Sequence, residues 1–226
     1  MKKQLKKLVG ILLAFTLIFS LQGIEVNAAT ARHYCIKYTT KSTWYGITAD
    51  IYLPSSINVV SNNNDYVDWY IGMDPTSGNN VEAGISYKNG QFRVFLNTGD
   101  KATSSSSIDS SIRPGQKVNL KIRLSSDGKK ATLYVNGVSR KTANTTGVFT
   151  NGKGKGKIVM GVQDGGTSTH SKAYFANVKL CANSAGTSYT NMTSSMGNSG
   201  KYAPTGSSNP YSIYSTFPIS ASLKKN

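Results

Sequence analysis

Residues 117–138 constrain the fold of this chain more than any other segment. Apolar and polar residues alternate along KVNLKIRL and again along ATLYV, so each run has one apolar and one polar face. Asp127-Gly128 separates the two runs and Asn136-Gly137 follows the second, and both dipeptides are typical of tight hairpin turns. Two amphipathic strands joined in this way predict an antiparallel sheet with one buried face.

The same period-two pattern recurs along the chain, and no segment has the periodicity of a long helix. The predicted strands span residues 34–38, 46–53, 66–73, 81–88, 91–97, 118–124, 131–136, 158–163 and 174–180. Residues 101–109 and the lysine–glycine tract 152–157 are predicted to be loops, and residues 211–223 one further strand. Many short strands separated by turn residues predict an all-β antiparallel sandwich.

The first 28 residues have the features of a secretory signal peptide. Lysines near the N-terminus precede an apolar run over residues 8–21, and small residues follow up to Ala28. The run is shorter than the about 20 residues that a membrane span needs, so we expect no stable membrane insertion. We expect a secreted protein, extracellular or associated with the cell wall. Residues 29–226 are predicted to form a single domain, on which a Ser/Thr/Gly-rich extension (182–226) packs.

The chain is strongly basic, with 26 lysines and arginines against 10 acidic residues and a net charge of +16. Outside a cell, such a balance attracts polyanions such as anionic wall polymers and glycans. The alternative is that the excess lysine only keeps the protein soluble. Several basic and aromatic residues could share the outer side of one sheet: Lys121, Arg123, Tyr134, Arg140 and Lys141. No nucleic-acid-binding fold is recognisable, so we expect no specific nucleic-acid partner. We also expect the protein to be a monomer.

The two cysteines, Cys35 and Cys181, lie near the two ends of the predicted domain. An oxidising compartment favours a disulfide between them, which would place the first predicted strand beside the last. The two histidines offer little for a zinc site or a catalytic triad. An acidic turn at Asp164 suggests calcium, but calcium needs about 6–8 oxygen ligands. We therefore predict no metal or other cofactor, with calcium as the open alternative.

Polar residues on three consecutive predicted strands are expected to share one face of a sheet. If these strands are neighbours, alternation brings together Tyr66, Asp68, Tyr70, Glu82, Ser86, Arg93 and Phe95. Aromatic rings beside carboxylates and an arginine suit a groove for a sugar or a peptide. The alternative is an ordinary solvated face on which Glu82 pairs with Arg93 or Lys88.

The order of the segments resembles a known superfamily. Pro114-Gly115-Gln116, VNLKIRL, ATLYVNGV and YFANVKL together are similar to the concanavalin A-like lectins and glucanases, including laminin G-like modules. The resemblance covers roughly residues 34–181 and implies a two-sheet antiparallel jelly roll. It also implies that a ligand groove lies on a concave sheet.

A narrower resemblance concerns DWYIGMD (68–74) and the following VEAGI (81–85). This pair is similar to the strands that carry the catalytic glutamine of secreted glutamic peptidases, the eqolisins. Glu82 stands at the glutamine position, and residues 92–96 lack the second catalytic residue, a glutamate. This departure argues against peptidase chemistry. The whole chain also resembles uncharacterised secreted proteins of Gram-positive bacilli, the YrpD type.

These observations favour a non-catalytic binding module for carbohydrate or cell-envelope polymer. The alternative is an extracellular hydrolase of the same fold that uses Glu82 and Asp68, since glycosidases need two carboxyl groups about 5–10 Å apart. The E-x-D-x-x-E array of the superfamily's retaining glucanases is absent, and no catalytic residue is assigned. A structural protein of the cell wall or matrix is the third alternative.

Overall fold

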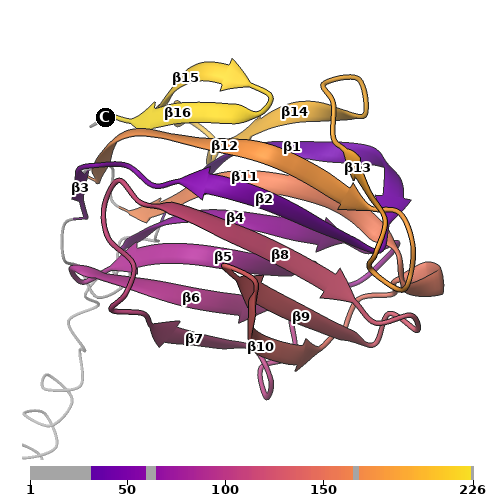
Figure 1. The fold of residues 1–226 in the computed structure, drawn as a ribbon. Coiled ribbons are helices and arrows are strands. Elements are labelled where there is room, and N and C mark those ends of the chain that lie inside the picture. The colour runs from indigo at the N-terminus through magenta and orange to yellow at the C-terminus, as the bar shows by residue number, and fades with distance from the viewer. Residues whose placement is uncertain (1–31, 60–64, 165–167, 225–226) are drawn as a thin grey trace, which may run out of the picture. The chain divides into compact units, whose positions relative to one another are not determined.

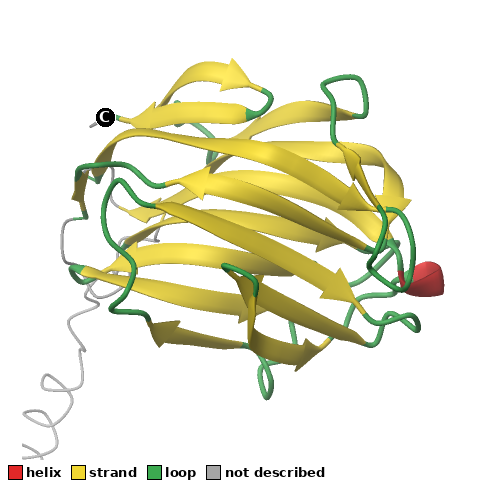
Figure 2. Cartoon of the chain, in the orientation of Figure 1, coloured by secondary structure: helices red, strands yellow, loops and turns green. Residues whose placement is uncertain are grey.

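The computed structural model describes residues 32–59, 65–164 and 168–224. These residues form two antiparallel sheets and one short 3-10 helix, Thr150–Gly152 (Figures 1 and 2). Sheet A has the order β14 (Gly197–Tyr202), β1 (Arg32–Trp44), β11 (Gly154–Asp164), β4 (Tyr66–Asp74), β5 (Val81–Lys88), β6 (Gln91–Asn97) and β7 (Ser105–Ile108). The predicted all-β class is confirmed.

Sheet B lies in front of sheet A in Figure 1. It has the order β10 (Val138–Asn144), β9 (Lys130–Val135), β8 (Lys117–Leu124), β2 (Gly46–Tyr52), β12 (Thr169–Cys181), β16 (Ile219–Leu223) and β15 (Tyr211–Thr216). Two short strands, β3 (Ile57–Asn58) and β13 (Tyr189–Asn191), also pair with β12.

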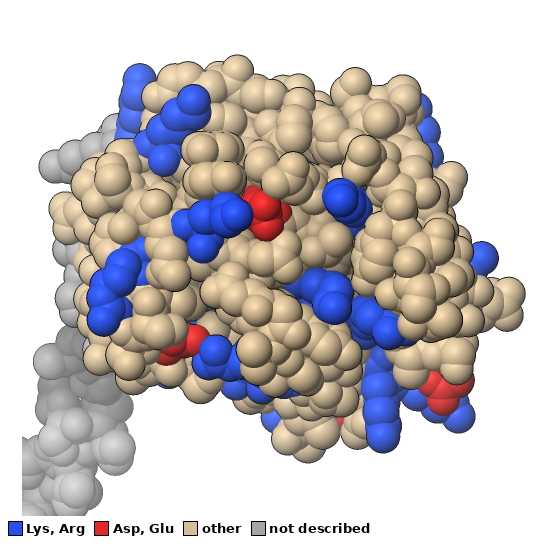
Figure 3. Space-filling view, viewed as in Figure 1, with Lys and Arg blue, Asp and Glu red and all other residues tan. Residues whose placement is uncertain are grey.

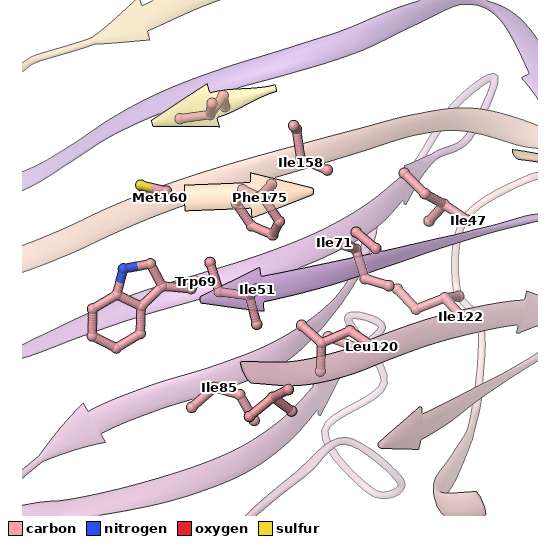
Figure 4. Packing of buried hydrophobic residues seen from close by; sticks show 14 of the residues in the cluster. Ile47, Ile51, Trp69, Ile71, Ile85, Leu120, Ile122, Ile158, Met160 and Phe175 are labelled. Atoms are coloured by element: carbon pink, nitrogen blue, oxygen red, sulfur yellow. The ribbon is translucent and has the colours of Figure 1, made fainter. Parts of the chain in front are cut away.

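The core lies between the two sheets. Side chains alternate along each strand, so the apolar residues of both sheets point into this space. Figure 4 shows Ile71 of β4 near Ile122 of β8, and Ile51 of β2 near Trp69 of β4; these side chains are fully buried. Burial of one such side chain stabilises the fold by about 1.5–3 kcal/mol. The same alternation leaves every second residue of each strand on an outer face of the sandwich.

Several strands escaped the sequence prediction, and most of them lie at sheet edges. β7 falls within the predicted serine-rich loop, and all four of its residues are exposed. β10 and β14 are likewise terminal strands, at one edge of sheet B and of sheet A. An edge strand can be held by backbone hydrogen bonds on one side and needs no apolar face, so hydrophobic periodicity does not reveal it.

The C-terminal extension contributes strands to both sheets. β14 pairs with β1, and β16 pairs with β12. Residues 211–223, predicted as one strand, form two strands, because the chain reverses after Thr216 and β15 pairs with β16. The extension therefore supplies one edge of each sheet. No helix in the described part of the chain is long and apolar enough to cross a membrane.

The predicted disulfide between Cys35 and Cys181 is wrong, because both cysteines are free and buried. Cys35 lies in β1 of sheet A, which pairs with β11 and β14 and not with β12. It packs with Tyr70 and Val159 on the outer face of that sheet. Cys181 lies in β12 of sheet B and donates a hydrogen bond to the carbonyl of Asn183, 3.2 Å away. The core therefore separates the two sulfur atoms.

We expect both thiols to be free in solution but protected by the fold. Burial raises the pKa of the Cys35 thiol, which further lowers its reactivity. A chromogenic thiol reagent should react with two equivalents per chain in denaturant and with far less in the native protein. A reducing agent should leave Tm unchanged. A fall of several degrees under reducing conditions would contradict the two free thiols.

Candidate functional site

Three rows of residues cross sheet A on the face that points away from the core. The registers of β11, β4, β5 and β6 define them as a lysine row (Lys157, Gly72, Glu82, Asn97), a tyrosine row (Val159, Tyr70, Gly84, Phe95) and an aspartate row (Gly161, Asp68, Ser86, Arg93). Each row contains one glycine next to a large or charged side chain. The predicted sharing of one face by residues of three neighbouring strands is confirmed.

The glycines allow neighbouring side chains to lie flat on the sheet. A Cβ atom on Gly72 would come within 2.5 Å of Lys157 Cε, and one on Gly84 within 2.6 Å of Tyr70 Cβ. A Cβ atom on Gly161 would collide with Asp68 Oδ1. These close approaches show why the three positions have no side chain, since each forms the floor on which a neighbour rests.

Lys157 joins two carboxylates beneath the surface of this face. Its side chain is 5% exposed, and its Nζ atom lies 2.8 Å from both Glu82 Oε1 and Asp74 Oδ1. Burial alone would lower the pKa of Lys157, but the charges of Glu82 and Asp74 outweigh it and raise that pKa. Tyr70 also donates a hydrogen bond to Glu82 Oε1 over 3.3 Å. Glu82 therefore pairs with Lys157, which the sequence placed in a solvated loop, and not with Arg93 or Lys88.

Asp68 is buried at the centre of the aspartate row. Desolvation first, and then the negative charge of Glu82, raise the pKa of Asp68 to about 8, although the backbone N–H of Gly161 acts in the opposite direction. The carboxyl group is therefore protonated at neutral pH and can donate a hydrogen bond. Burial likewise lowers the pKa of nearby His33, so its imidazole is neutral at that pH.

Above the rows lies an open groove with a volume of about 430 Å³. The groove is lined by Tyr66, Asp68, Glu82, Ser86, Lys88, Arg93, Phe95, Asn97 and Ser106. Six of the seven residues predicted to share this face line it. The seventh, Tyr70, is buried beneath, where its ring meets the edge of Phe95 at 5.9 Å and 69°. Arg93 is anchored by a hydrogen bond from Nε to Ser106 Oγ over 3.2 Å.

The sequence prediction missed the part of this face that β1 and β11 contribute. Cys35 and Val159 form an apolar cluster with Tyr70, and Phe95 packs against it. Lys157 carries the central charge of the site. Its signal was the strict Gly-Lys alternation of residues 152–157, which fits a strand with lysines on one face. The pairing of β11 with β4 joins segments about 90 residues apart, and period-two patterns contain no information on such pairing.

The two carboxyl groups proposed for hydrolysis lie in different rows. Asp68 faces Ser86, whereas Glu82 faces Gly72, so their backbones are separated by four residues along β4, or about 13 Å. Tyr70 lies between them on the same face of β4, and Lys157 holds Glu82 in the lysine row. The two residues are therefore not directly opposed on neighbouring strands, and Glu82 is already engaged by Lys157 and Tyr70.

His170, one of the two histidines considered for catalysis, lies apart from the groove. His170 is buried in the core, 5.3 Å from the ring of Trp69, and its Nδ1 atom is 2.6 Å from the carbonyl of Ser171. No group of three or more His, Cys, Asp or Glu side chains within the described segments could hold a metal ion. The acidic turn considered for calcium includes residues 165–167, which lie outside the described residues.

The fold and the groove define a two-sheet jelly roll with an accessible face on one sheet. Residues 57–184 match the family model of the concanavalin A-like lectin/glucanases superfamily. The match spans more than half of the chain, and the protein therefore belongs to this superfamily. The resemblance drawn from the sequence and the predicted jelly roll are both confirmed.

Solved structures of glutamic peptidases share this fold over nearly their whole length. Scytalido-glutamic peptidase with a transition state analog inhibitor has a TM-score of 0.57 and 14% identity, covering 86% of this chain and 98% of its own. SCP-B, a member of the eqolisin family, has a TM-score of 0.54 and 9% identity, covering 87% and 98%. The Bacillus licheniformis β-glucanase covers 57% of both chains with a TM-score of 0.34 and 15% identity. No curated protein matches the sequence.

Proposed function

We propose that the protein is a secreted, monomeric, non-catalytic module that binds glycan or anionic cell-envelope polymer in the groove on sheet A. The observation that carries the proposal is the groove itself. Tyr66 and Phe95 provide aromatic surface for sugar rings, and Arg93, Asn97 and the protonated Asp68 provide hydrogen-bond donors for hydroxyl or acidic groups.

The charges around the groove favour a neutral or anionic ligand. Lys157 compensates the charge of Glu82, and Asp68 is uncharged at neutral pH. Lys88 and Arg93 therefore dominate the potential at the groove. A polymer with carboxylate or phosphate groups would gain from both residues, and its binding would weaken as salt is added.

The geometry supports binding better than hydrolysis. The likeness to glutamic peptidases would suggest peptide cleavage, but by the sequence resemblance Glu82 replaces their catalytic glutamine and residues 92–96 contain no glutamate. Asp68 and Glu82 lie in separate rows, with Tyr70 between them. A structural role in the wall or matrix needs no groove with converging aromatic and polar groups, so the groove favours a binding module over it.

We expect substitutions in the groove to weaken binding to the glycans that a glycan array and isolated cell walls identify. Arg93→Ala and Phe95→Ala should each reduce affinity about tenfold, which corresponds to the loss of about 1.4 kcal/mol. Lys129→Ala, in an exposed turn outside the groove, is the matched control and should bind like the wild type. Titration calorimetry gives the affinities, and circular dichroism verifies folding.

Two results would count against this function. Unchanged binding of both groove variants would exclude the groove as the binding site. Release of products from any bound polymer, abolished by Glu82→Gln, would instead support the extracellular hydrolase. Recovery of a processed chain from the medium of a secreting host, with its N-terminus close to residue 29, tests the proposed secretion.

A further inference from the structure

The outer face of sheet B, on the opposite side of the sandwich from the groove, is basic and rich in tyrosine. Alternation points Leu120 and Ile122 of β8 into the core, and it therefore points Lys121 outward. We call the outward residues the tyrosine–lysine face, and its central members are Tyr52, Lys121, Tyr134, Lys172, Tyr174 and Tyr214. Figure 3 shows this side of the molecule, with Lys and Arg distributed over it and few acidic side chains.

The tyrosine rings hold the lysines in place on this face. Lys121 Nζ lies 4.1 Å from the centre of the Tyr134 ring, and Lys172 Nζ lies 5.7 Å and 5.4 Å from those of Tyr174 and Tyr214. Cation–π contacts of this kind stabilise the position of the ammonium group. A ligand would therefore meet cations that have already lost part of their freedom, which lowers the entropic cost of binding.

Carboxylates of the protein do not neutralise these lysines. Asp50 is the only acidic residue in the described strands of sheet B. It is 8% exposed, and its two oxygens accept hydrogen bonds of 2.8 Å from the side-chain amides of Asn119 and Asn177. The ion pairs among the described residues involve only Arg140 and Lys157 as cations. The positive charge of the tyrosine–lysine face is therefore available to a ligand.

The face also has the extent and shape that suit a polymer. It reaches from β9 to β15, across five inter-strand spacings, which corresponds to roughly 24 Å. At one end, a hollow of about 410 Å³ lies beside Lys172, Tyr174 and Tyr214. Tyr174 and Tyr214 are 36% and 61% exposed, so they offer apolar contact area next to the charge.

We propose that the tyrosine–lysine face is a second binding surface, separate from the groove, for a polyanionic polysaccharide. The contacts of the rings favour this ligand over single-stranded nucleic acid, because base stacking requires free ring faces. Here Tyr52 stacks on Tyr174 at 4.4 Å and 8°, and lysines lie over Tyr134, Tyr174 and Tyr214. With the groove on sheet A, the module would have two opposed surfaces and could link two polymer chains.

The test uses the full chain and heparin as a polyanionic saccharide probe, with affinity measured over a series of salt concentrations. The variant Lys121→Gln/Lys172→Gln/Lys179→Gln removes three charges from sheet B, since Lys179 is an exposed residue of β12 that alternation points outward from the buried Leu180. The control Lys37→Gln/Lys41→Gln/Lys201→Gln removes three exposed charges from sheet A. Each contact is expected to release about 0.7–0.9 counterion. The sheet B variant should therefore reduce the magnitude of the slope of log affinity against log salt by about two. It should also lower the affinity at low salt at least about tenfold. The control should change the affinity less than threefold.

Equal losses in the two triple variants would overturn the proposal, because net charge alone would then explain binding. Tighter binding of a single-stranded oligonucleotide than of heparin with the same number of charges would also overturn it, in favour of nucleic acid. The sheet B triple variant should bind the glycans of the groove like the wild type, whereas Arg93→Ala should lose them, so failure of the groove and failure of this face are distinguishable. Equal Tm values of the variants and the wild type would verify that all of them fold.

Discussion

Replacing Lys157 with methionine is expected to lower the free energy of unfolding by about 3 kcal/mol. Methionine keeps most of the side-chain volume above Gly72 but leaves Glu82 and Asp74 without their cation. Both carboxylates are about a quarter exposed, at 27% and 24%, so water compensates part of the loss and the effect lies at the low end for a broken buried ion pair. Urea denaturation monitored by circular dichroism measures the change.

Lys155→Met is the matched control for Lys157→Met. Lys155 belongs to the same lysine–glycine tract and the same face of β11, but it is exposed. Its replacement should change the free energy of unfolding by no more than about 0.5 kcal/mol. Adding Glu82→Gln to Lys157→Met should restore part of the lost stability, because one unpaired charge is removed. Equal effects of Lys155→Met and Lys157→Met would contradict a structural role of the ion pair.

The part of the groove formed by consecutive strands could be predicted from the sequence. β4, β5 and β6 follow one another in the chain and pair as neighbours, and the Asn89-Gly90 turn sets the register between the last two. Period-two alternation then decides which side each residue takes, so the seven predicted residues share one face. Lys157, Cys35 and Val159 come from strands whose neighbours are distant in sequence, and local pattern does not contain that pairing.

The disulfide prediction failed for a related reason. The argument from an oxidising compartment concerns the chemistry of cysteine and says nothing about which sheet each cysteine occupies. Side-chain alternation argues against this disulfide. Ile36 and Leu180 are core residues, so the neighbouring Cys35 and Cys181 must point outward from their sheets. The edge strands β7 and β10 were missed for a different reason. Their sequences are mostly exposed and polar, so they resemble loops unless the neighbouring strand is known.

Asp68→Asn is expected to stabilise the protein in alkaline solution by up to about 6 kcal/mol. The pKa of Asp68 is about 8 in the folded state, whereas an unfolded chain would release this proton near its ordinary pKa of 3.8. The folded state therefore binds one more proton than the unfolded state between pH 4 and pH 8, and stability falls as the pH rises through this interval. Asparagine has nearly the same shape but does not ionise, so the decrease in stability with rising pH disappears.

Titration of His170 changes the free energy of unfolding with pH in the opposite direction, which makes the effect of Asp68→Asn easier to recognise. Burial lowers the pKa of His170 to about 4, so the unfolded state binds the extra proton between pH 4 and the ordinary pKa of 6.5, and stability rises with pH over that interval. The contribution of Asp68 opposes that of His170 in the wild type below pH 6.5, and above it the free energy of unfolding should fall up to pH 8. In Asp68→Asn only the rise due to the buried histidines, His170 and to a lesser degree the less buried His33, should remain, followed by a plateau. Parallel curves for the two proteins, measured by urea denaturation from pH 4 to pH 9, would show that Asp68 is ionised in the folded state and would remove the neutral hydrogen-bond donor from the groove.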